Sequence, residues 1–302
     1  MQVNPICGFL GSGKTTLLRR IIGERSGREP MAVIVNEFGA VGIDGAILSG
    51  TNVDMVEITS GCICCTLKGS LVSALEELRD KKGVERVVIE ATGVAQPAEM
   101  LDVLADPALR DSVVVGPMVT VVDAANFSGL RRVLGRFYAE QVERADVVLL
   151  NKTDLTSPEQ LERVRRDITA LNRRATVATT ERCNVELSLV LDRTADAREP
   201  SALDQGLASP APSASFVSFV VSAGFDAQRE RVEAFFGSLT PEVVRAKGFM
   251  TIDGEPRTVQ FAAGRLEISP AAHPRTLSVV FISSTEPDRA AIQAALEGTR
   301  SA

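Results

Sequence analysis

Residues 8–15, GFLGSGKT, have the composition and spacing of a loop that wraps a chain of phosphates. The segment fits the pattern G-x-x-x-x-G-K-[ST] in full and lies between a strand-like and a helix-like stretch, as such a loop requires. Backbone N–H groups and the helix N-terminus favour bound phosphate, a lysine neutralises β- and γ-phosphate charge, and a hydroxyl ligates Mg²⁺. We therefore predict that a nucleoside triphosphate and Mg²⁺ bind at Gly8, Gly11, Ser12, Gly13, Lys14, Thr15 and Thr16, with Lys14 and Thr15 also serving catalysis.

A second motif, NKTD at 151–154, indicates which base accompanies the phosphates. It ends the strand-like run DVVLLN. A carboxylate at Asp154 can accept hydrogen bonds from the N1–H and the N2 amine of guanine, whereas adenine lacks both donors and would leave the carboxylate unpaired. Asn151 and the aliphatic stem of Lys152 are expected to hold the base and the loop. The predicted nucleotide is therefore GTP rather than ATP.

Two acidic segments also follow strand-like runs. In EATG, 90–93, Glu90 can hold Mg²⁺ through water and Gly93 can offer its amide to the γ-phosphate, although most GTPases have aspartate at this point. In NEFG and the residues after it, Glu37 and Asp44 lie on an expected switch loop and are candidates to orient the attacking water. An ordinary solvated loop acid is the alternative interpretation of each carboxylate.

Three cysteines lie together in GCICC, 61–65, at an expected strand-to-helix turn. Thiolates near a helix N-terminus have a lowered pKa, and sulfur ligands select soft ions such as Zn²⁺ or Cu(I). Cys62, Cys64 and Cys65 would supply three ligands of a tetrahedral site, and Glu37, a water or a residue of another protein could fill the fourth position. A Cys62–Cys65 disulfide and simple core packing are the alternatives.

The elements that must position these motifs alternate between strand-like and helix-like patterns up to about residue 192. Strands that are apolar throughout, alternating with helices, indicate an α/β domain with a mostly parallel sheet covered on both faces. The strand-like runs are VNPIC, AVIVN, VDMVEI, RVVIEA, MVTVVDA, DVVLLN and ATVATT. Pro5 is expected at the very start of its strand, because a proline removes a hydrogen bond of the sheet. Ser157 is expected to cap the helix that follows it, with Gln160 completing a capping box.

A change of composition predicts the domain boundaries. Residues 193–214 are rich in Ala, Ser, Pro and Asp and have no apolar period, which indicates a flexible linker. Residues 1–192 are then the P-loop domain. Residues 215–302 alternate strand-like and helix-like runs and predict a smaller α+β domain, with a turn near Gly264.

The overall composition excludes several classes of protein. The 302-residue chain is 45% apolar, which is enough for a sizeable core, and its net charge of -6 without a long basic block argues against a nucleic-acid partner. No run approaches the ~20 apolar residues of a membrane helix, and the N-terminus does not read as a signal peptide. An odd number of cysteines predicts a reducing, cytoplasmic location, with Cys7 and Cys183 as core residues.

The motifs taken together resemble the CobW family of metal-handling GTPases. GFLGSGKTTLL, VNEFGAVGID, GCICC, EATGVAQP, VVDA and NKTDL follow one another in the order of that family, and VVRAKGF at 243–249 resembles the signature of its C-terminal domain. The resemblance implies a GTPase of the SIMIBI class, related to the urease and hydrogenase nickel-insertion GTPases. Such a protein binds a transition metal, zinc or cobalt, and delivers it to a client metalloprotein. Unlike many similar proteins, this chain has no histidine-rich run in its linker.

A mechanism follows from this resemblance as an expectation. GTP and Mg²⁺ would order the segments 36–44 and 61–66, which assembles the thiolate site, and hydrolysis would reopen it and release the metal. Without an evident glutamine or arginine finger, intrinsic turnover should be slow, and a partner or a GTP-dependent homodimer could accelerate it. Two alternatives stay open at this point: a P-loop kinase for a small molecule, and a metal reservoir or scaffold that GTP merely stabilises.

Overall fold

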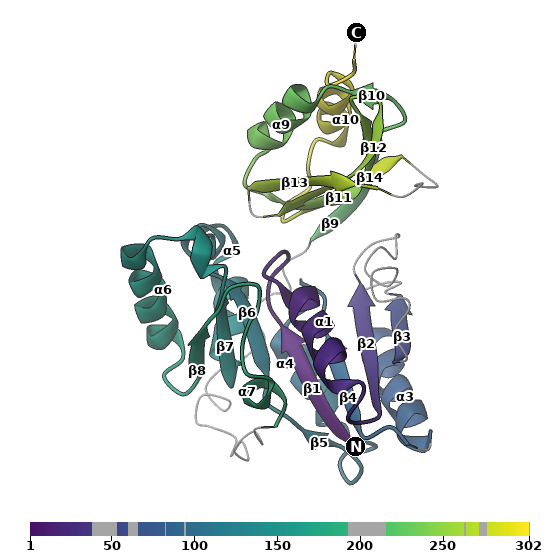
Figure 1. Cartoon of the computed structure of the whole chain (residues 1–302), viewed down its shortest axis with the longest axis vertical. Helices are drawn as coiled ribbons and strands as arrows, with labels where there is room; N and C mark the ends of the chain where they lie inside the picture. Colours follow the sequence, from purple (N-terminus) through teal and green to yellow (C-terminus); the bar gives the residue numbers. More distant parts are fainter. Residues whose placement is uncertain are drawn as a thin grey trace. The chain divides into compact units, whose positions relative to one another are not determined.

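A computed structural model describes most of the chain, which divides into two compact units, Met1–Ser213 and Ala214–Ala302 (Figure 1). The described residues are 1–37, 53–59, 66–81, 83–93, 95–192, 216–262, 264–271 and 277–301. The predicted linker at 193–214 therefore lies outside them. No helix within these ranges has the length and the apolar character needed to cross a membrane.

The first unit is built on a parallel sheet with the strand order β3-β2-β4-β1-β6-β7-β8, and β5 lies beside β1. Its strands are β1 (Gln2–Cys7), β2 (Met31–Glu37), β3 (Asp54–Thr59), β4 (Arg86–Glu90), β5 (Val114–Val115), β6 (Val119–Asp123), β7 (Val147–Asn151) and β8 (Thr176–Thr179). Its helices are α1 (Lys14–Arg25), α3 (Thr66–Asp80), α4 (Pro97–Leu104), α5 (Phe127–Glu143), α6 (Pro158–Leu171) and α7 (Leu187–Leu191), with the 3₁₀ turn η1 at Thr153–Leu155. The predicted parallel α/β architecture is confirmed.

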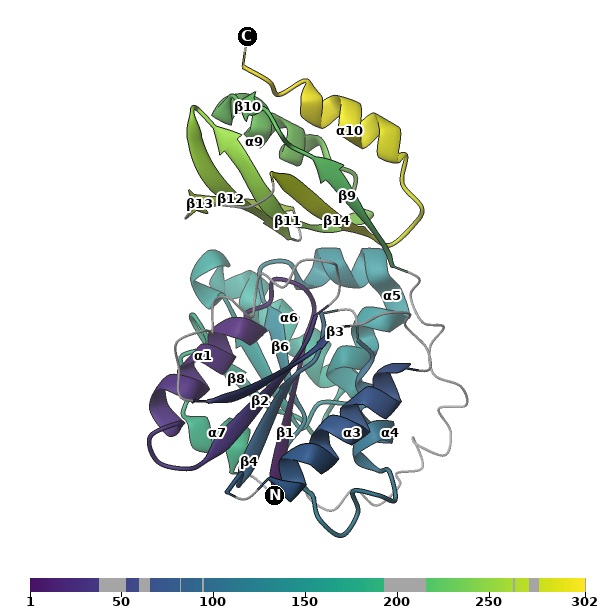
Figure 2. The same ribbon diagram turned by 90° about the vertical axis from the view of Figure 1, so that its right-hand side faces the viewer.

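Alternating strand residues fill a core on each face of this sheet. Val33 and Val35 of β2 pack with α1 and α7, whereas Ala32 and Ile34 pack with α3 and α4. Figure 2 shows these two pairs of helices on opposite sides of the strands. Because both faces are covered, the strands are apolar throughout, and this is the pattern that made them recognisable in the sequence.

The expectation for Pro5 was wrong, since Pro5 lies in the middle of β1 and is paired with Ile89 of β4. On the other side of β1 the neighbour changes along the strand. Gln2 and Val3 pair with β5, while Ile6 and Cys7 pair with β6. Pro5 stands in the gap between these two ladders, where its missing N–H costs no hydrogen bond of the sheet.

The N-terminus of α6 shows the predicted cap but not the full capping box. The Ser157 hydroxyl accepts a hydrogen bond from the Gln160 N–H at 3.3 Å. The Gln160 side chain does not return to Ser157, because its amide donates to the Ala125 carbonyl at 3.1 Å. Gln160 thus ties α6 to the segment that follows β6.

The second unit is a mainly antiparallel sheet with the order β13-β12-β11-β14-β9, to which β10 adds a short parallel pair with β11. Its elements are β9 (Val217–Ser222), β10 (Asp226–Ala227), α9 (Arg229–Ser238), β11 (Val243–Ile252), β12 (Glu255–Ala262), β13 (Arg265–Pro270), β14 (Ser278–Ser283) and α10 (Arg289–Glu297). Phe236 of α9 packs with Phe261 and Phe281 of the sheet in its core. This confirms the predicted smaller α+β fold.

The described motif residues of the first unit gather at one edge of its sheet. Parallel strands that share a sheet bring their carboxyl ends to the same side. GFLGSGKT follows β1, Glu37 ends β2, Glu90 ends β4 and Asn151 ends β7. The fold therefore places residues that are far apart in the chain around a common site.

Candidate active site

The loop after β1 has the backbone conformation of a phosphate-binding loop. Gly8, Gly11 and Gly13 have φ angles of 132°, 74° and 121°, in the left-handed region that glycine tolerates best. Gly13 is also enclosed, since a Cβ atom there would lie 2.5 Å from Asn151 Nδ2 and 3.1 Å from Cys183 Sγ. The Ser12 hydroxyl is buried and has no hydrogen-bond partner among the residues that the structure describes. This loop can thus present backbone N–H groups and one hydroxyl to a bound anion.

Lys14 begins α1 and folds back over the loop. Its side chain is buried, and its ammonium group donates to the carbonyls of Gly8 at 2.9 Å and Phe9 at 3.3 Å. A buried positive charge favours an anionic partner strongly, because water screens it poorly. The geometry places this charge at the loop that a phosphate would occupy.

Thr15 and Glu90 meet beside the phosphate loop. The Thr15 hydroxyl donates to Glu90 Oε1 at 2.9 Å, and Glu90 is buried at the end of β4. A hydroxyl and a carboxylate are the oxygen ligands that suit Mg²⁺. Gly93 packs directly on the loop, since a Cβ atom there would lie 2.6 Å from the Leu10 N. Thr16, by contrast, is exposed in the first turn of α1.

Asn151 connects three loops through its side-chain amide. Its Nδ2 donates to the Ser12 carbonyl at 2.9 Å, and its Oδ1 accepts from the Thr180 hydroxyl at 3.1 Å and from the Cys183 N–H at 2.9 Å. Both the nitrogen and the oxygen of the side-chain amide are thus engaged in hydrogen bonds. Asn151 therefore connects the phosphate loop to the 180–185 loop, and its contact with the base stays a prediction.

The remaining NKTD residues lie at the open edge of the site. Lys152 has a left-handed φ of 61°, and its ammonium forms an ion pair with Asp123 at 2.8 Å. Asp123 also accepts hydrogen bonds from the N–H groups of Ala125 and Asn126, so the Lys152 stem is held in place. The side chain of Asp154 is exposed in η1, where its carboxylate can meet a ligand.

The 180–185 loop is a part of the site that the sequence interpretation missed. Thr180 follows β8 and its carbonyl accepts from the Thr153 N–H at 3.3 Å, which joins this loop to NKTD. Cys183 is fully buried, as predicted, but it lies under the phosphate loop, with its Sγ 3.4 Å from the Gly13 carbonyl. The loop's position in the sequence could have indicated it, because the loop follows the next parallel strand after NKTD and so lies at the same edge of the sheet.

The two buried cysteines, Cys7 and Cys183, have thiols that resist ionisation. Burial raises the pKa of Cys7 and of Cys183 to about 12 in each case. A thiol with such a pKa stays protonated at neutral pH and is a poor nucleophile and metal ligand. Neither cysteine is therefore suited to metal binding or thiol chemistry.

A thiol reagent should distinguish these two cysteines from the clustered ones. At pH 8, native metal-free protein should be modified at Cys62, Cys64 and Cys65, while Cys7 and Cys183 stay unmodified because their thiols are buried and protonated. Mass mapping of the labelled peptides measures this, and labelling after unfolding in guanidinium provides the control in which both buried thiols react. Fast labelling of Cys183 in the native protein would contradict the prediction.

The candidate metal ligands lie largely outside the described part of the chain. Cys62, Cys64 and Cys65 are not described, and of Glu37 only the backbone in β2 is. Asp44, the other candidate to orient the attacking water, also lies outside the described residues. Within the described residues, no group of three or more His, Cys, Asp or Glu side chains could hold a metal ion. The register of β2 and β3 is described, and it pairs Glu37 with Thr59, the last residue of β3 before GCICC.

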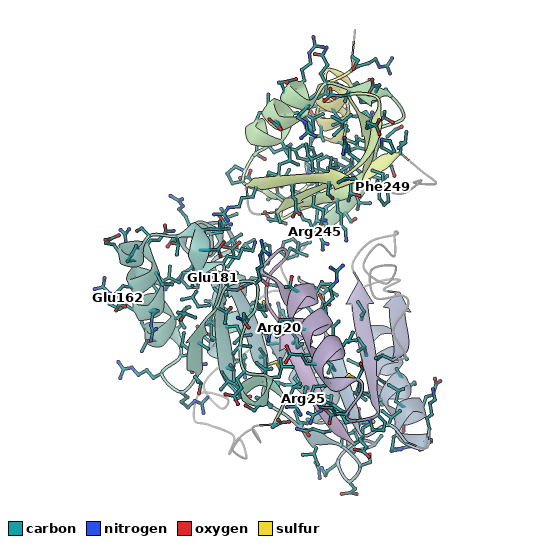
Figure 3. All side chains as sticks on the ribbon, viewed as in Figure 1. Arg20, Arg25, Glu162, Glu181, Arg245 and Phe249 are labelled. Atoms are coloured by element: carbon teal, nitrogen blue, oxygen red, sulfur yellow. The ribbon has the colours of Figure 1, made fainter. Side chains whose placement is uncertain are left out.

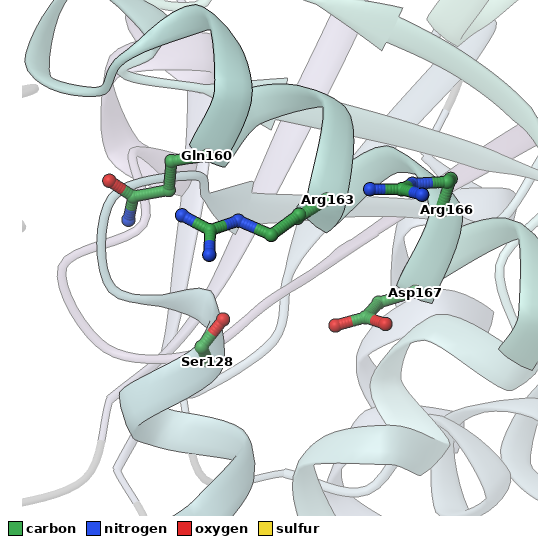
Figure 4. A pocket seen from close by; sticks show the side chains of 5 residues that line it. All are labelled: Ser128, Gln160, Arg163, Arg166 and Asp167. Carbon is green, nitrogen blue, oxygen red and sulfur yellow. The ribbon is translucent and has the colours of Figure 1, made fainter.

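A separate cleft of about 490 Å³ lies between α5 and α6. Ser128, Gln160, Arg163, Arg166 and Asp167 line it (Figure 4). None of these is a predicted site residue, and Asp167 is engaged by Arg131 at 3.6 Å. We assign this cleft no part in the nucleotide site.

Comparison with known families decides the class of protein. Residues 2–179 match the family model of the CobW/HypB/UreG nucleotide-binding domain. Residues 216–300 match the model of the cobalamin synthesis protein CobW C-terminal domain. The chain belongs to the CobW family. It is therefore a P-loop GTPase, a hydrolase that acts on GTP, and the alternative of a small-molecule kinase is rejected.

Three relatives of this CobW-family GTPase illustrate the match. Zinc chaperone CobW of Sinorhizobium sp is 28% identical over 96% of this chain and 95% of its own length. Zinc chaperone YjiA of Escherichia coli (strain K12) is 32% identical over 86% of this chain and 85% of its own length. The zinc-regulated GTPase metalloprotein activator 1 of Schizosaccharomyces pombe is 36% identical over 57% of this chain and 44% of its own.

A solved structure shows the same fold. The crystal structure of Zn(II)-bound YjiA GTPase from E. coli superimposes with a TM-score of 0.50 and 24% identity, covering 100% of this chain and 99% of that one. The CobW-family GTPase described here thus combines the parallel and antiparallel units of that protein.

Proposed function

We propose that this CobW-family GTPase is a zinc metallochaperone, which binds Zn²⁺ at Cys62, Cys64 and Cys65 and transfers it to a client metalloprotein in a GTP-dependent manner. Zinc is favoured over cobalt because the relatives that align over most of the chain are named as zinc chaperones. A client metalloprotein is consistent with the name of the S. pombe relative, a metalloprotein activator. Soft thiolate ligands also suit Zn²⁺.

The observation that carries this proposal is the order of the strands at the site. Strand β2 lies between β3 and β4, so Glu37 at the end of β2 has Thr59 of β3 on one side, while β4 on its other side ends at Glu90. GCICC begins two residues after Thr59, and Glu90 contacts Thr15 of the phosphate loop. The strand that leads to GCICC and the strand that ends at Glu90 are thus separated by β2 alone, which supports a zinc site close to the nucleotide.

The described residues support GTP as the substrate of this site. The unpartnered Ser12 hydroxyl and the buried Lys14 ammonium would meet the phosphates, and Gly93 would bring its amide toward the γ-phosphate. Asp154 would pair with guanine and select against adenine. Thr15 and Glu90 would hold Mg²⁺, which neutralises phosphate charge during transfer when it is bound.

Glu37 and Asp44 are the two candidates to orient the attacking water. Glu37 is also the candidate fourth ligand of zinc. A carboxylate that faces the γ-phosphate in one state and the metal in the other would couple hydrolysis to release, since it cannot serve both at once. The client, or a second copy of the chain in the GTP state, is the partner that would receive or stabilise the loaded form.

Zinc titration in two nucleotide states tests the proposal. Zinc affinity with a non-hydrolysable GTP analogue should differ from that with GDP by roughly 5- to 150-fold, the range of ~1–3 kcal/mol for coupled sites. By linkage, zinc must change the ratio of the affinities for the GTP analogue and for GDP by the same factor. Equal zinc affinities in the two states would contradict the chaperone mechanism and favour a metal reservoir that GTP merely stabilises.

A further inference from the structure

We propose that Arg20 is a positioning residue for the guanine base, acting through the 180–185 loop. The inference rests on the function proposed above for NKTD as the guanine site. Arg20 lies on the helix that begins at the phosphate loop, and it is neither a phosphate ligand nor part of a recognised motif. Its contacts nevertheless join that helix to the loop beside Asp154.

The guanidinium of Arg20 holds the second half of this loop through its backbone carbonyls. Its Nη1 donates to the carbonyls of Cys183 and Val185, the second at 3.2 Å. Its Nη2 donates to Glu24 on the same helix at 2.7 Å, which fixes the orientation of the planar group. Arg20 and Glu181, the second residue of the loop, are labelled in Figure 3. The planar group thus holds two carbonyls of the loop through Nη1 and Glu24 through Nη2, whereas a lysine has a single nitrogen for all three contacts.

The loop needs such a clamp because its backbone is strained. Arg182 and Cys183 have φ angles of 50° and 55°, a left-handed conformation that side chains other than glycine disfavour. Residues stay in this region only where surrounding contacts hold them there. Asn151 supplies one such contact through the Cys183 N–H, and Arg20 supplies another through the Cys183 carbonyl. Cys183 is therefore held on both sides of its strained backbone.

Two backbone N–H groups of the strained loop are candidate donors to a bound base. Within the described residues, the backbone N–H groups of Glu181 and Arg182 donate to no acceptor. Thr180, directly before them, is bonded to Thr153, which is next to Asp154 in NKTD. A base that pairs with Asp154 through N1–H and the N2 amine would direct its 6-carbonyl oxygen toward another donor. The Arg20 clamp would place a loop N–H for that oxygen.

Binding affinities for three nucleotides, GDP, IDP and ADP, distinguish this role from a general effect on folding. Guanine and hypoxanthine both have the 6-carbonyl, whereas adenine has an amine there. Arg20→Met should therefore lower the affinities for GDP and IDP by the same factor, roughly 5- to 10-fold for one well-placed hydrogen bond. The affinity for ADP should not change. In GTP hydrolysis the KM should rise with little change in kcat, because the loop does not touch the reacting atoms. Arg20→Lys should give an intermediate loss.

Arg25→Met is the matched control. Arg25 lies on the same helix with 23% of its side chain exposed, compared with 25% for Arg20, and it pairs with Asp192 rather than with the loop. The Arg25→Met variant should bind GDP, IDP and ADP with wild-type affinities. Equal losses for all three nucleotides in Arg20→Met, or unchanged GDP affinity, would overturn the inference. If Arg20→Met does not fold, the graded loss in Arg20→Lys decides. Wild-type protein that does not prefer GDP over ADP would instead refute the guanine site itself.

Discussion

Asp154→Asn is expected to exchange guanine for xanthine as the preferred base. The Asp154 carboxylate can accept from both guanine donors, and hydrogen bonds to a charged group are worth more than neutral ones. An asparagine offers one acceptor and one donor, so GTP should bind about 2–3 kcal/mol more weakly, roughly 30- to 150-fold. Xanthine has an oxygen where guanine has the N2 amine, and the asparagine amide can donate to it. XTP should therefore bind the variant better than GTP does.

Competition titrations with GTP, XTP and ATP measure this exchange. Asp154 is exposed and forms no ion pair in the described structure, so the substitution should leave the thermal stability of the nucleotide-free protein unchanged. Glu162→Gln, an exposed acid on α6 (Figure 3), removes the same charge without touching the site and should keep GTP preference. Undiminished GTP binding by Asp154→Asn, or ATP binding as tight as GTP binding by the wild type, would show that the guanine assignment is wrong.

The parallel sheet could be predicted from the sequence because its strands are buried on both faces. Runs such as RVVIEA need no tertiary information to be recognised, and the strand ends carry the motifs by the geometry of parallel sheets. The contact between Thr15 and Glu90 illustrates this, since 75 residues separate them in the chain. Each was selected from its own short motif, and the fold brought them together.

Contacts that depend on the neighbouring strand could not be predicted in the same way. Pro5 was misplaced because a single strand does not reveal that its partner changes from β5 to β6 beside the proline. Cys183 was recognised as apolar core, but nothing near it in sequence indicates the Gly13 carbonyl, 170 residues away. Arg20 likewise reads as an ordinary helix-surface arginine. Local patterns report burial, whereas these roles are set by register and by loops that meet only in the folded chain.

Alanine at any one of Cys62, Cys64 and Cys65 is expected to abolish tight zinc binding. Mutation of a residue that only orients a metal ligand lowers metal affinity by about 10- to 100-fold. Loss of a ligand itself should therefore lower zinc affinity by at least about 100-fold. Wild-type protein should bind about one Zn²⁺ per chain and release protons as the thiols ionise. Co²⁺ as a spectroscopic probe should give sulfur-to-metal charge transfer in the near ultraviolet, and each variant should lose intensity.

Cys7→Ala and Cys183→Ser are the controls that separate the cluster from cysteine content in general. Both residues are buried with a pKa raised to about 12, so neither can offer a thiolate, and zinc affinity should stay within a factor of about two of wild type. Glu37→Gln distinguishes the fourth ligand, since loss of its charge should weaken zinc less than loss of a thiolate does. Zinc binding that survives in the Cys62, Cys64 and Cys65 variants would place the metal elsewhere and contradict the proposed site. Zinc binding that is lost in those variants, but equal in the GTP and GDP states of the wild type, would retain the site and reject its coupling to the nucleotide.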